Sequence, residues 1–429
     1  KKENIIWQLV IVYLLQCYLL PYQVFFMLSL GILLWECIKS HFRVPVVRTP
    51  ELNAYIFLLI FITMVGFIRY PLRFAARDVY YEFGNIIIVL IGYFMYSREH
   101  GFKRIYTTIF FMAGLVSMIT VLMGIANIIT GNVSFAIFRE SFSVGIKSLE
   151  FLIPIYTIWI FWYGKMLISR KVDRIIIAFW AIQVFANLSR TTLIAIFSCY
   201  AMTVCCLSYT HKIDVKRVKR ALLMCLGICV IIIVAIKMMP GDVLSHFFDK
   251  FARSFTEVSS KNTFTSLAEA NNNWRGYEIS RAIEQWKESS FMEQIFGAGN
   301  GTLIGINFVP DLWNEILETV NGITGVTVLH NSYYTLLIKG GVLTVTVFCL
   351  VFVLGIKRGY SYLRRARTEE EILLSLSLIF LCVTMMIDAY ITRGMVQNDI
   401  QFIWSILFGW INAKMIKYKE IIRLSLIHI

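Results

Sequence analysis

Apolar stretches recur along almost the whole chain, and each is close to the length of about 20 residues that an α-helix needs to cross a lipid bilayer. The chain has 429 residues, of which 58% are hydrophobic and only 16% are charged. A soluble domain carries about 25% charged residues, so a protein this apolar has too few polar groups to cover a water-exposed surface. We therefore expect an all-α fold, a polytopic transmembrane helix bundle of about 12 helices.

The predicted helices share the length and hydropathy of membrane spans. They cover residues 4–20, 22–38, 52–68, 80–96, 105–130, 148–168, 174–188, 191–209, 221–239, 333–355, 372–389 and 400–416. Pro21 separates the first two, whereas only Leu188–Thr191 separates the seventh from the eighth. No small-residue cleavage site follows the first stretch, which predicts a retained helix and not a signal peptide. All nine cysteines lie within apolar stretches, so we expect buried thiols and no disulfide framework.

Basic residues are concentrated in every second connection between the predicted helices, as in the cytoplasmic loops of membrane proteins. The long segment 240–329 has the opposite balance, with eleven acidic and six basic residues. This pattern predicts cytoplasmic termini and a large helical outer loop between helices 9 and 10. The domains are then 1–239 for the N-terminal bundle, 240–329 for the outer loop, and 330–429 for the last helices and a cytoplasmic tail. Because the net charge of +14 is spread over many short clusters, we do not expect nucleic acid as a partner.

Several arginines lie on the outer side, against the general charge bias. Arg69, Arg73 and Arg77 follow the third predicted helix at four-residue spacing, and they form one ridge if this stretch is helical. The other outer arginines are Arg190, Arg275 and Arg393. Guanidinium groups bind phosphate oxygens in pairs, so the set predicts an outward-facing phosphate or carboxylate site. The alternative is that each arginine extends to lipid headgroups or pairs with a loop carboxylate.

His330 lies where the outer loop re-enters the membrane, directly before the tenth predicted helix. Asn331 or Ser332 can cap that helix, which places His330 at its N-terminal end. A helix N-terminus keeps a nearby imidazole neutral, and a neutral imidazole accepts a proton from a hydroxyl. We predict His330 as a general base, with Asn331 and Tyr334 as substrate contacts. The alternative is an interfacial histidine that only hydrogen-bonds the loop.

A glycine-rich turn, Phe296–Gly301, precedes this histidine in the outer loop and contains Gly297 and Gly299. Its backbone N–H groups can bind phosphate, and the turn can equally serve to fold the loop. It follows no evident βαβ unit, so it does not match a nucleotide-binding fingerprint. We include both glycines among the candidate substrate contacts.

Sequence motifs for metal and nucleotide chemistry are absent. The chain has no Asp-x-Asp pair, no His-Glu-x-x-His, no Walker lysine motif and no Gly-x-Ser-x-Gly, so we expect no metal and no cofactor. Glu36 and Asp388 lie near the ends of predicted helices. An ion-coupled transporter places carboxylates deep in its bundle, so these positions argue against transport.

The second half of the chain resembles the superfamily of O-antigen polymerases and O-antigen ligases. The resemblance covers about residues 185–350 and lies in the order of short motifs and their side of the membrane. These motifs are Ser189-Arg190-Thr191, Trp274-Arg275-Gly276, the glycine-rich turn, His330-Asn331-Ser332-Tyr333 and Lys339-Gly340-Gly341-Val342. The first half of the chain matches the superfamily only in topology.

The resemblance implies a membrane glycosyltransferase of the GT-C type in the cytoplasmic membrane of a bacterium, with its active site facing outward. Arg190, Arg275 and His330 match the functional residues of the superfamily, and Arg281 is a competing match for the loop arginine. The implied partners are the bilayer, a polyprenyl-diphosphate-linked glycan donor, a glycan acceptor and a chain-length regulator protein. The expected diphosphate ligands are Arg69, Arg73, Arg77, Arg281 and Arg393.

Ser-Arg-Thr in place of the Ser-Arg-Gly of many ligases favours a polymerase that joins lipid-linked repeat units by inverting, metal-independent transfer. A ligase with a different acceptor is the nearest alternative. A flippase or transporter of an anionic lipid-linked glycan would use the same outer arginines without His330, and a scaffold protein would need neither.

Overall fold

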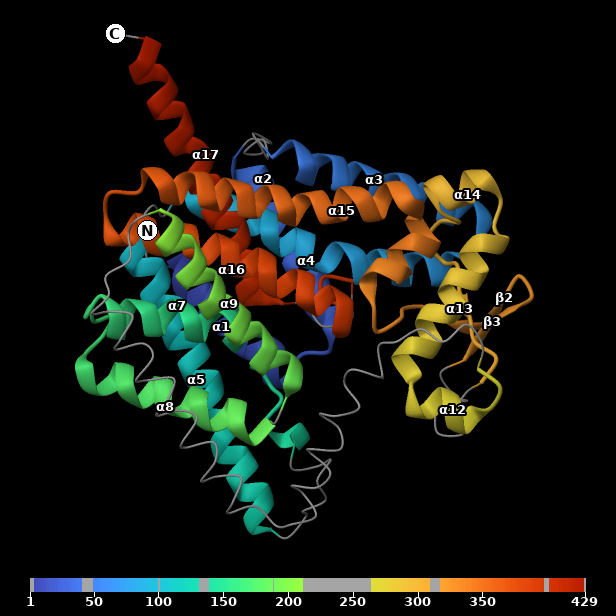
Figure 1. The fold of residues 1–429 in the computed structure, drawn as a ribbon, viewed down its shortest axis with the longest axis horizontal. Helices are drawn as coiled ribbons and strands as arrows, with labels where there is room; N and C mark the ends of the chain where they lie inside the picture. Colours follow the sequence, from blue (N-terminus) through green and yellow to red (C-terminus); the bar gives the residue numbers. More distant parts are fainter. Residues whose placement is uncertain are drawn as a thin grey trace.

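The computed structural model describes residues 4–40, 49–98, 101–130, 139–187, 189–210, 264–308, 317–396 and 401–427. Within these residues the chain forms a bundle of long helices, with short helices and strands gathered at one end (Figure 1). We call this end, where α12–α14 and β1–β3 lie, the loop end.

The helices of the bundle occupy most of the described residues. They are α1 (Asn4–Tyr18), α2 (Tyr22–Lys39), α3 (Pro50–Arg69), α4 (Leu72–Arg98), α5 (Phe102–Ile129), α7 (Ile146–Thr157) with the π-helical turn η1 (Ile158–Trp162), α8 (Arg170–Asn187), α9 (Arg190–Tyr209), α15 (Ser332–Arg365), α16 (Glu369–Ile391) and α17 (Phe402–Ile427). The loop end adds α12 (Leu267–Asn272), α13 (Trp274–Glu288), α14 (Phe291–Phe296), β1 (Ile304–Gly305), β2 (Glu318–Val320) and β3 (Ile323–Val326).

Every stretch predicted as a membrane helix contains a helix in the structure, except 221–239, which lies outside the described residues. The predicted division between the seventh and eighth helices is confirmed, because α8 ends at Asn187 and the Ser189 side chain caps α9. Seven helices in the described part of the chain are long and apolar enough to cross a membrane. The chain is therefore a multi-pass, all-α membrane protein in its main features, and the number of twelve crossings stays a prediction.

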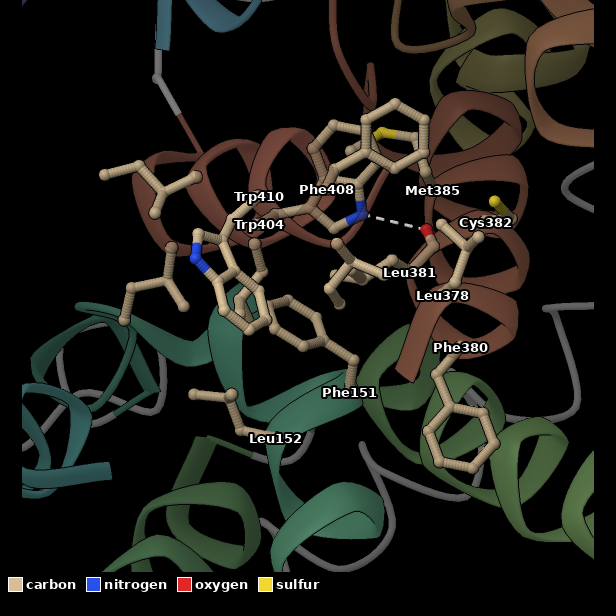
Figure 2. Packing of buried hydrophobic residues seen from close by; sticks show 14 of the residues in the cluster. Phe151, Leu152, Leu378, Phe380, Leu381, Cys382, Met385, Trp404, Phe408 and Trp410 are labelled. Carbon is tan, nitrogen blue, oxygen red and sulfur yellow. Dashed lines mark hydrogen bonds between the residues drawn. The ribbon is translucent and has the colours of Figure 1, made fainter. Parts of the chain in front are cut away.

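The middle of the bundle is formed where α4, α16 and α17 pack together. Gly92 and Gly409 allow α4 and α17 to approach closely, since a Cβ on Gly409 would lie 2.1 Å from the Val89 carbonyl oxygen. Small residues give membrane helices this close contact. Trp404 of α17 donates its indole N–H to the Leu381 carbonyl of α16 at 2.8 Å, which satisfies a polar group inside the core (Figure 2).

The segment between α9 and α15 does not stand apart from the bundle. Its three short helices are followed by a small antiparallel sheet in the order β1-β3-β2, so the loop predicted as helical also contains strands. Its glycine-rich turn packs between α3 and α15, where Ala298 and Gly299 donate their N–H groups to the carbonyls of Ile338 and Lys339. Those carbonyls precede a break in α15 at Gly341, whose φ of 67° is not helical.

This break and the turn packed against it explain why the sequence has glycine at positions 341 and 297. A Cβ on Gly341 would lie 2.2 Å from the Ile295 carbonyl oxygen, and a Cβ on Gly297 would lie 2.1 Å from the Lys339 carbonyl oxygen. Only glycine fits either position, because both combine a positive φ with backbone contact. The interrupted helix thus fixes the loop against the membrane bundle.

Candidate functional site

His330 and Glu278 form the central contact of the loop end. The Nδ1 atom of His330 lies 3.0 Å from both carboxylate oxygens of Glu278, and the His330 backbone N–H donates to Oε2 at 3.1 Å. Trp274 donates its indole N–H to Oε1 of the same carboxylate at 2.9 Å. Glu278 is almost fully buried, whereas the His330 side chain is 30% exposed. The carboxylate is therefore held from several directions, and the imidazole keeps access to the surface.

Local capping positions both members of this pair. Asn273 accepts a hydrogen bond from the Gly276 N–H at 3.3 Å and begins α13, which carries Glu278. Asn331 accepts from the backbone N–H groups at positions 333 and 334 and begins α15. The predicted cap is thus Asn331, and His330 lies directly before the helix N-terminus, as expected.

This geometry selects one tautomer of His330. A carboxylate that accepts only hydrogen bonds favours a hydrogen on Nδ1, so the lone pair of the neutral ring lies on Nε2. If Nε2 takes up a proton, the buried Glu278 carboxylate stabilises the imidazolium. The same division of roles occurs in hydrolases in which an acid orients a histidine base. The sequence did not single out Glu278, although its position three residues after Arg275 puts both on one helical face.

Arg393 is the outer arginine bound most directly to this site. Its backbone N–H donates to the His330 carbonyl at 2.8 Å, and its own carbonyl accepts from the Ser332 hydroxyl. The backbone of Arg393 has a φ of 76°, a conformation that is costly for a residue with a side chain and persists when its surroundings impose it. Within the described residues, the buried Nε atom of Arg393 has no hydrogen-bond partner.

Arg77 of α4 is a second arginine with buried N–H groups. Arg77 pairs through Nη1 with Glu318 of β2 and lies 5.2 Å from the centre of the Phe74 ring. Its Nε and Nη2 atoms are buried and have no hydrogen-bond partner in the part of the chain that the structure describes. Arg393, beside the start of α15, and Arg77, on α4, thus both have buried N–H donors that no described residue satisfies.

The predicted ridge of three arginines on one helix is corrected by the structure. Pro71 separates α3 from α4, so Arg69 ends one helix, while Arg73 and Arg77 share the next. Arg69 pairs with Glu293 at 2.6 Å, and Arg73, which is 82% exposed, lies 3.5 Å from Glu318. Pairing with loop carboxylates, the simpler of the two interpretations, thus accounts for the contacts of Arg69 and Arg73.

The pair between Arg69 and Glu293 also belongs to the capping of α14. Partial burial disfavours the charged form of Glu293, but hydrogen bonds from Ser290 and Arg69 outweigh it and lower the pKa of this carboxyl below its ordinary value. The carboxylate therefore remains charged at neutral pH and connects the end of α3 to the loop end.

The two candidate loop arginines have different surroundings. Arg281 donates from Nε to the Gly305 carbonyl at 3.2 Å and pairs with Glu284, so it holds β1 against α13. Arg275 lies one turn before Glu278 on α13. Since Arg281 lies one turn after Glu278, position on the helix does not separate the two arginines; the contacts of Arg281 with β1 and Glu284 are what distinguish it.

The glycine-rich turn uses its N–H groups within the protein. Besides the two bonds to α15, the Gly297 N–H donates to the Glu293 carbonyl, the Asn300 N–H to the Ile62 carbonyl, and the Gly301 N–H to Asp78 at 2.6 Å. The turn role proposed for Gly297 and Gly299 accounts for these contacts. A phosphate-binding role for the two glycines has no contact in its favour and stays a prediction.

A buried ionic cluster lies under this turn. Lys339 pairs with Asp78 at 2.5 Å, and Asn300 donates to Glu82 at 2.9 Å. Asp78 and Glu82 lie one turn apart on α4, and both are almost completely buried. Asp78 lies outside the predicted helix 80–96, which begins two residues too late to include it.

A second buried cluster connects α7, α9 and α16. Lys147 lies 3.0 Å from Glu150 and 2.5 Å from Asp388, and Thr192 donates to Glu150 at 2.9 Å. Thr392, next to Arg393 in the chain, donates to Asp388 at 3.0 Å. This cluster therefore extends from the beginning of α9, where Arg190 lies, to the segment bonded to the His330 backbone.

Arg190 is the first residue of α9, and it lies close enough to Arg139 for the two charges to repel. Burial and this repulsion lower the pKa of Arg139 from its ordinary value. Arg190 thus lies at the beginning of α9, from which the second cluster extends to the segment bonded to the His330 backbone.

The two clusters are also compatible with transport. Glu36 and Asp388 lie near helix ends, whereas Asp78, Glu82 and Glu150 are carboxylates buried inside the bundle. Ionisable groups in such positions are characteristic of transport pathways as well as of catalytic sites.

No protein-family model matches this chain, and no curated protein matches it significantly.

Proposed function

We propose that this protein is a membrane glycosyltransferase that polymerises polyprenyl-diphosphate-linked oligosaccharide repeat units into a surface polysaccharide. The observation that carries the proposal is the contact of His330 with the buried carboxylate of Glu278 at the loop end. A histidine oriented in this way serves proton transfer, which glycosyl transfer to a hydroxyl requires. The order of motifs that resembles the O-antigen polymerase and ligase superfamily gives the substrate class.

In the proposed reaction, Nε2 of His330 takes the proton of the acceptor hydroxyl as its oxygen forms a bond to the anomeric carbon of the donor. The bond between that carbon and the diphosphate oxygen breaks at the same time, and the electron pair leaves with the diphosphate. Attack opposite the leaving group inverts the anomeric centre. Glu278 stabilises the imidazolium that forms, and the proton is later released to solvent.

The leaving diphosphate needs positive charge that is already in place. Arg393, whose backbone is bonded to that of His330, offers a buried N–H donor, as does Arg77, and Arg275 lies on the helix that carries Glu278. Fixed donors directed at developing negative charge are commonly a major catalytic contribution. We assign Arg393, Arg77, Arg275 and Arg190 to the diphosphate, and Arg69 and Arg73 to the docking of the loop.

The proposal is tested by the surface-glycan profile of a deletion strain that carries wild type or His330→Ala, with equal amounts of protein in the membrane. The polymerase interpretation predicts a ladder of glycan lengths with wild type and single repeat units with the variant. Transfer of one finished glycan to a different acceptor, without a ladder, would identify a ligase instead. An unchanged ladder with His330→Ala would remove the catalytic assignment.

Transport of an anionic lipid-linked glycan is a second candidate, favoured by the buried clusters around Lys339 and Lys147. Such a protein would move substrate in liposomes without making glycosidic bonds, and His330→Ala would leave movement intact. Measuring substrate orientation and product formation on the same liposomes distinguishes the two functions.

A further inference from the structure

A polar cavity of about 180 Å³ lies beside the second buried cluster. Its walls come from α1, the start of α2, the segment before α7 and the start of α17. The residues that define its chemistry are Tyr13, Gln16, Tyr22, Lys147, Ser148 and Gln401. Nothing in the proposed reaction uses this cavity.

The wall formed by residues 142–145 is held in place by the bundle. Gln183 of α8 donates to the carbonyls of Phe142 and Val144 at 3.2 and 2.6 Å. Gly145 then begins α7 with a φ of 72°, and a Cβ there would lie 3.3 Å from the Tyr13 hydroxyl oxygen. These contacts make the cavity a preformed feature, which reduces the entropic cost of binding.

The size of the cavity limits what it can hold. A volume of about 180 Å³ lies below the roughly 300 Å³ at which pockets for drug-sized ligands begin. The space suits one six-membered sugar ring with its hydroxyls.

The lining of the cavity suits a sugar. Tyr13 and Phe402, whose ring centres lie 5.6 Å apart, form an aromatic part of the wall, which offers an apolar surface to the C–H groups of a sugar. Gln16, Ser148 and Gln401 supply amide and hydroxyl groups, which can both donate and accept hydrogen bonds. Lining of this kind, part aromatic and part neutral polar, recognises a ring that has one apolar face and many hydroxyls.

Charge disfavours an acidic ligand in the same cavity. Its lysine, Lys147, is already in contact with two buried carboxylates, Glu150 and Asp388. One positive and two negative groups leave this wall without an excess of positive charge, so a uronic acid gains no stabilisation there. A neutral ring needs no positive charge in the wall.

The cavity is connected to the histidine site through hydrogen bonds to Arg393 and Gly394. Gln401, in the cavity wall, donates to the Gly394 carbonyl at 3.5 Å. The neighbouring Arg393 N–H donates to the His330 carbonyl at 2.8 Å. The wall of the cavity and the backbone of His330 are therefore bonded to two adjacent residues, Gly394 and Arg393.

We propose that this cavity binds one uncharged sugar ring of the glycan substrate, other than the ring that reacts. The inference rests on the proposed function for the origin of the sugar, whereas binding itself is independent of catalysis. The cavity would position the glycan so that another of its rings lies at His330.

Cys17 lines the cavity, so its alkylation reports on occupancy in the wild-type protein. We would measure the rate of alkylation by N-ethylmaleimide in nanodiscs, by peptide mass spectrometry, with glucose, galactose, N-acetylglucosamine or glucuronate as probes. A ligand at a concentration equal to its Kd slows the reaction of Cys17 about two-fold. Cys37, on α2 and outside the cavity lining, is the control thiol and keeps its rate.

The expected result is protection of Cys17 by at least one neutral sugar, no protection by glucuronate, and loss of protection in Tyr22→Ala. The exposed tyrosine Tyr209 gives the matched variant, Tyr209→Ala, which retains protection. Absence of protection by every neutral sugar overturns the proposal, as does equal protection by glucuronate. Failure of Cys17 to react at all does the same, because the cavity is then closed to solutes.

Catalysis gives a separate readout, so the two proposals can fail independently. If the cavity binds sugar and the protein forms no glycosidic bonds, the binding proposal stands and the proposed function is lost. If bonds form and no neutral sugar protects Cys17, the proposed function stands and the cavity has no role in binding glycan.

Discussion

The Nζ atom of Lys339 lies 2.5 Å from Oδ2 of Asp78, and both side chains are essentially inaccessible to solvent. This ion pair connects α15, directly before its break, to α4, and Asp78 also accepts the N–H of Gly301. One buried pair therefore holds the interrupted helix, the glycine-rich turn and the membrane bundle together. The docked loop in turn carries Glu278 to His330.

Lys339→Met is expected to lower stability strongly, because it leaves the Asp78 carboxylate buried without its cation. Removing one partner of a buried pair costs about 3–5 kcal/mol. The double variant Lys339→Met, Asp78→Asn removes both charges and is expected to recover much of this loss. Thermal unfolding in detergent, followed by size-exclusion chromatography, measures both variants, and additive losses in the double variant would show that the pair is not coupled.

Gly297→Ala is expected to undock the loop. Gly297 has a φ of 82°, and a Cβ there would lie 2.1 Å from the Lys339 carbonyl oxygen, so strain adds to a backbone clash. A strained backbone alone costs about 1–3 kcal/mol. Limited proteolysis should cleave the loop faster in this variant than in Gly322→Ala, where a Cβ meets no atom within 4 Å although φ is also positive. Equal cleavage of the two would mean that the close packing at Gly297 is not needed.

Glu278→Gln is expected to reduce kcat by about 10²-fold or more while leaving KM within a small factor, the range for loss of an oriented acid–base group. Three donors converge on the Glu278 carboxylate, from the His330 ring, the His330 backbone and Trp274. Glutamine would turn an NH₂ group towards one of them and would remove the charge that stabilises imidazolium. Glu284→Gln, on the exposed part of the same helix, is the control and should retain activity; a similar loss in both variants would indicate a general defect of α13.

Arg393→Ala is expected to lower kcat much more than Arg73→Ala. Loss of one fixed donor to a developing oxyanion costs about 2.7–4 kcal/mol, or about 10²–10³-fold in kcat, and we expect this loss for Arg393. Arg73 is mostly exposed and 3.5 Å from Glu318, and such surface pairs contribute about 0–1 kcal/mol. Initial rates with saturating lipid-linked substrate measure the difference, and an intact kcat in Arg393→Ala would remove this arginine from the diphosphate site.

The apolar stretches predicted most of the helices because bilayer length and helix rise fix how many residues a span requires. His330 was located correctly relative to its helix, since the capping preference of Asn331 acts over three residues. Two contacts were not predicted, the one between Glu278 and His330 and the one between Asp78 and Lys339. The members of each pair lie far apart in sequence and meet only in the folded protein. The partners of the arginines could not be predicted either, because charge and spacing do not reveal that Arg69 pairs with Glu293 and Arg73 with Glu318.

The most direct measurement is the initial rate of glycosidic bond formation by purified protein in liposomes that contain only lipid-diphosphate-linked repeat units, with wild type compared with His330→Gln. Glutamine keeps hydrogen bonding at this position and cannot take up a proton at neutral pH. Proton abstraction by His330 predicts bond formation with wild type and a loss of about 10²–10⁴-fold in the variant. A His330→Gln protein with the wild-type rate would contradict the account at its centre, and a wild-type protein that forms no bonds would exclude the glycosyltransferase.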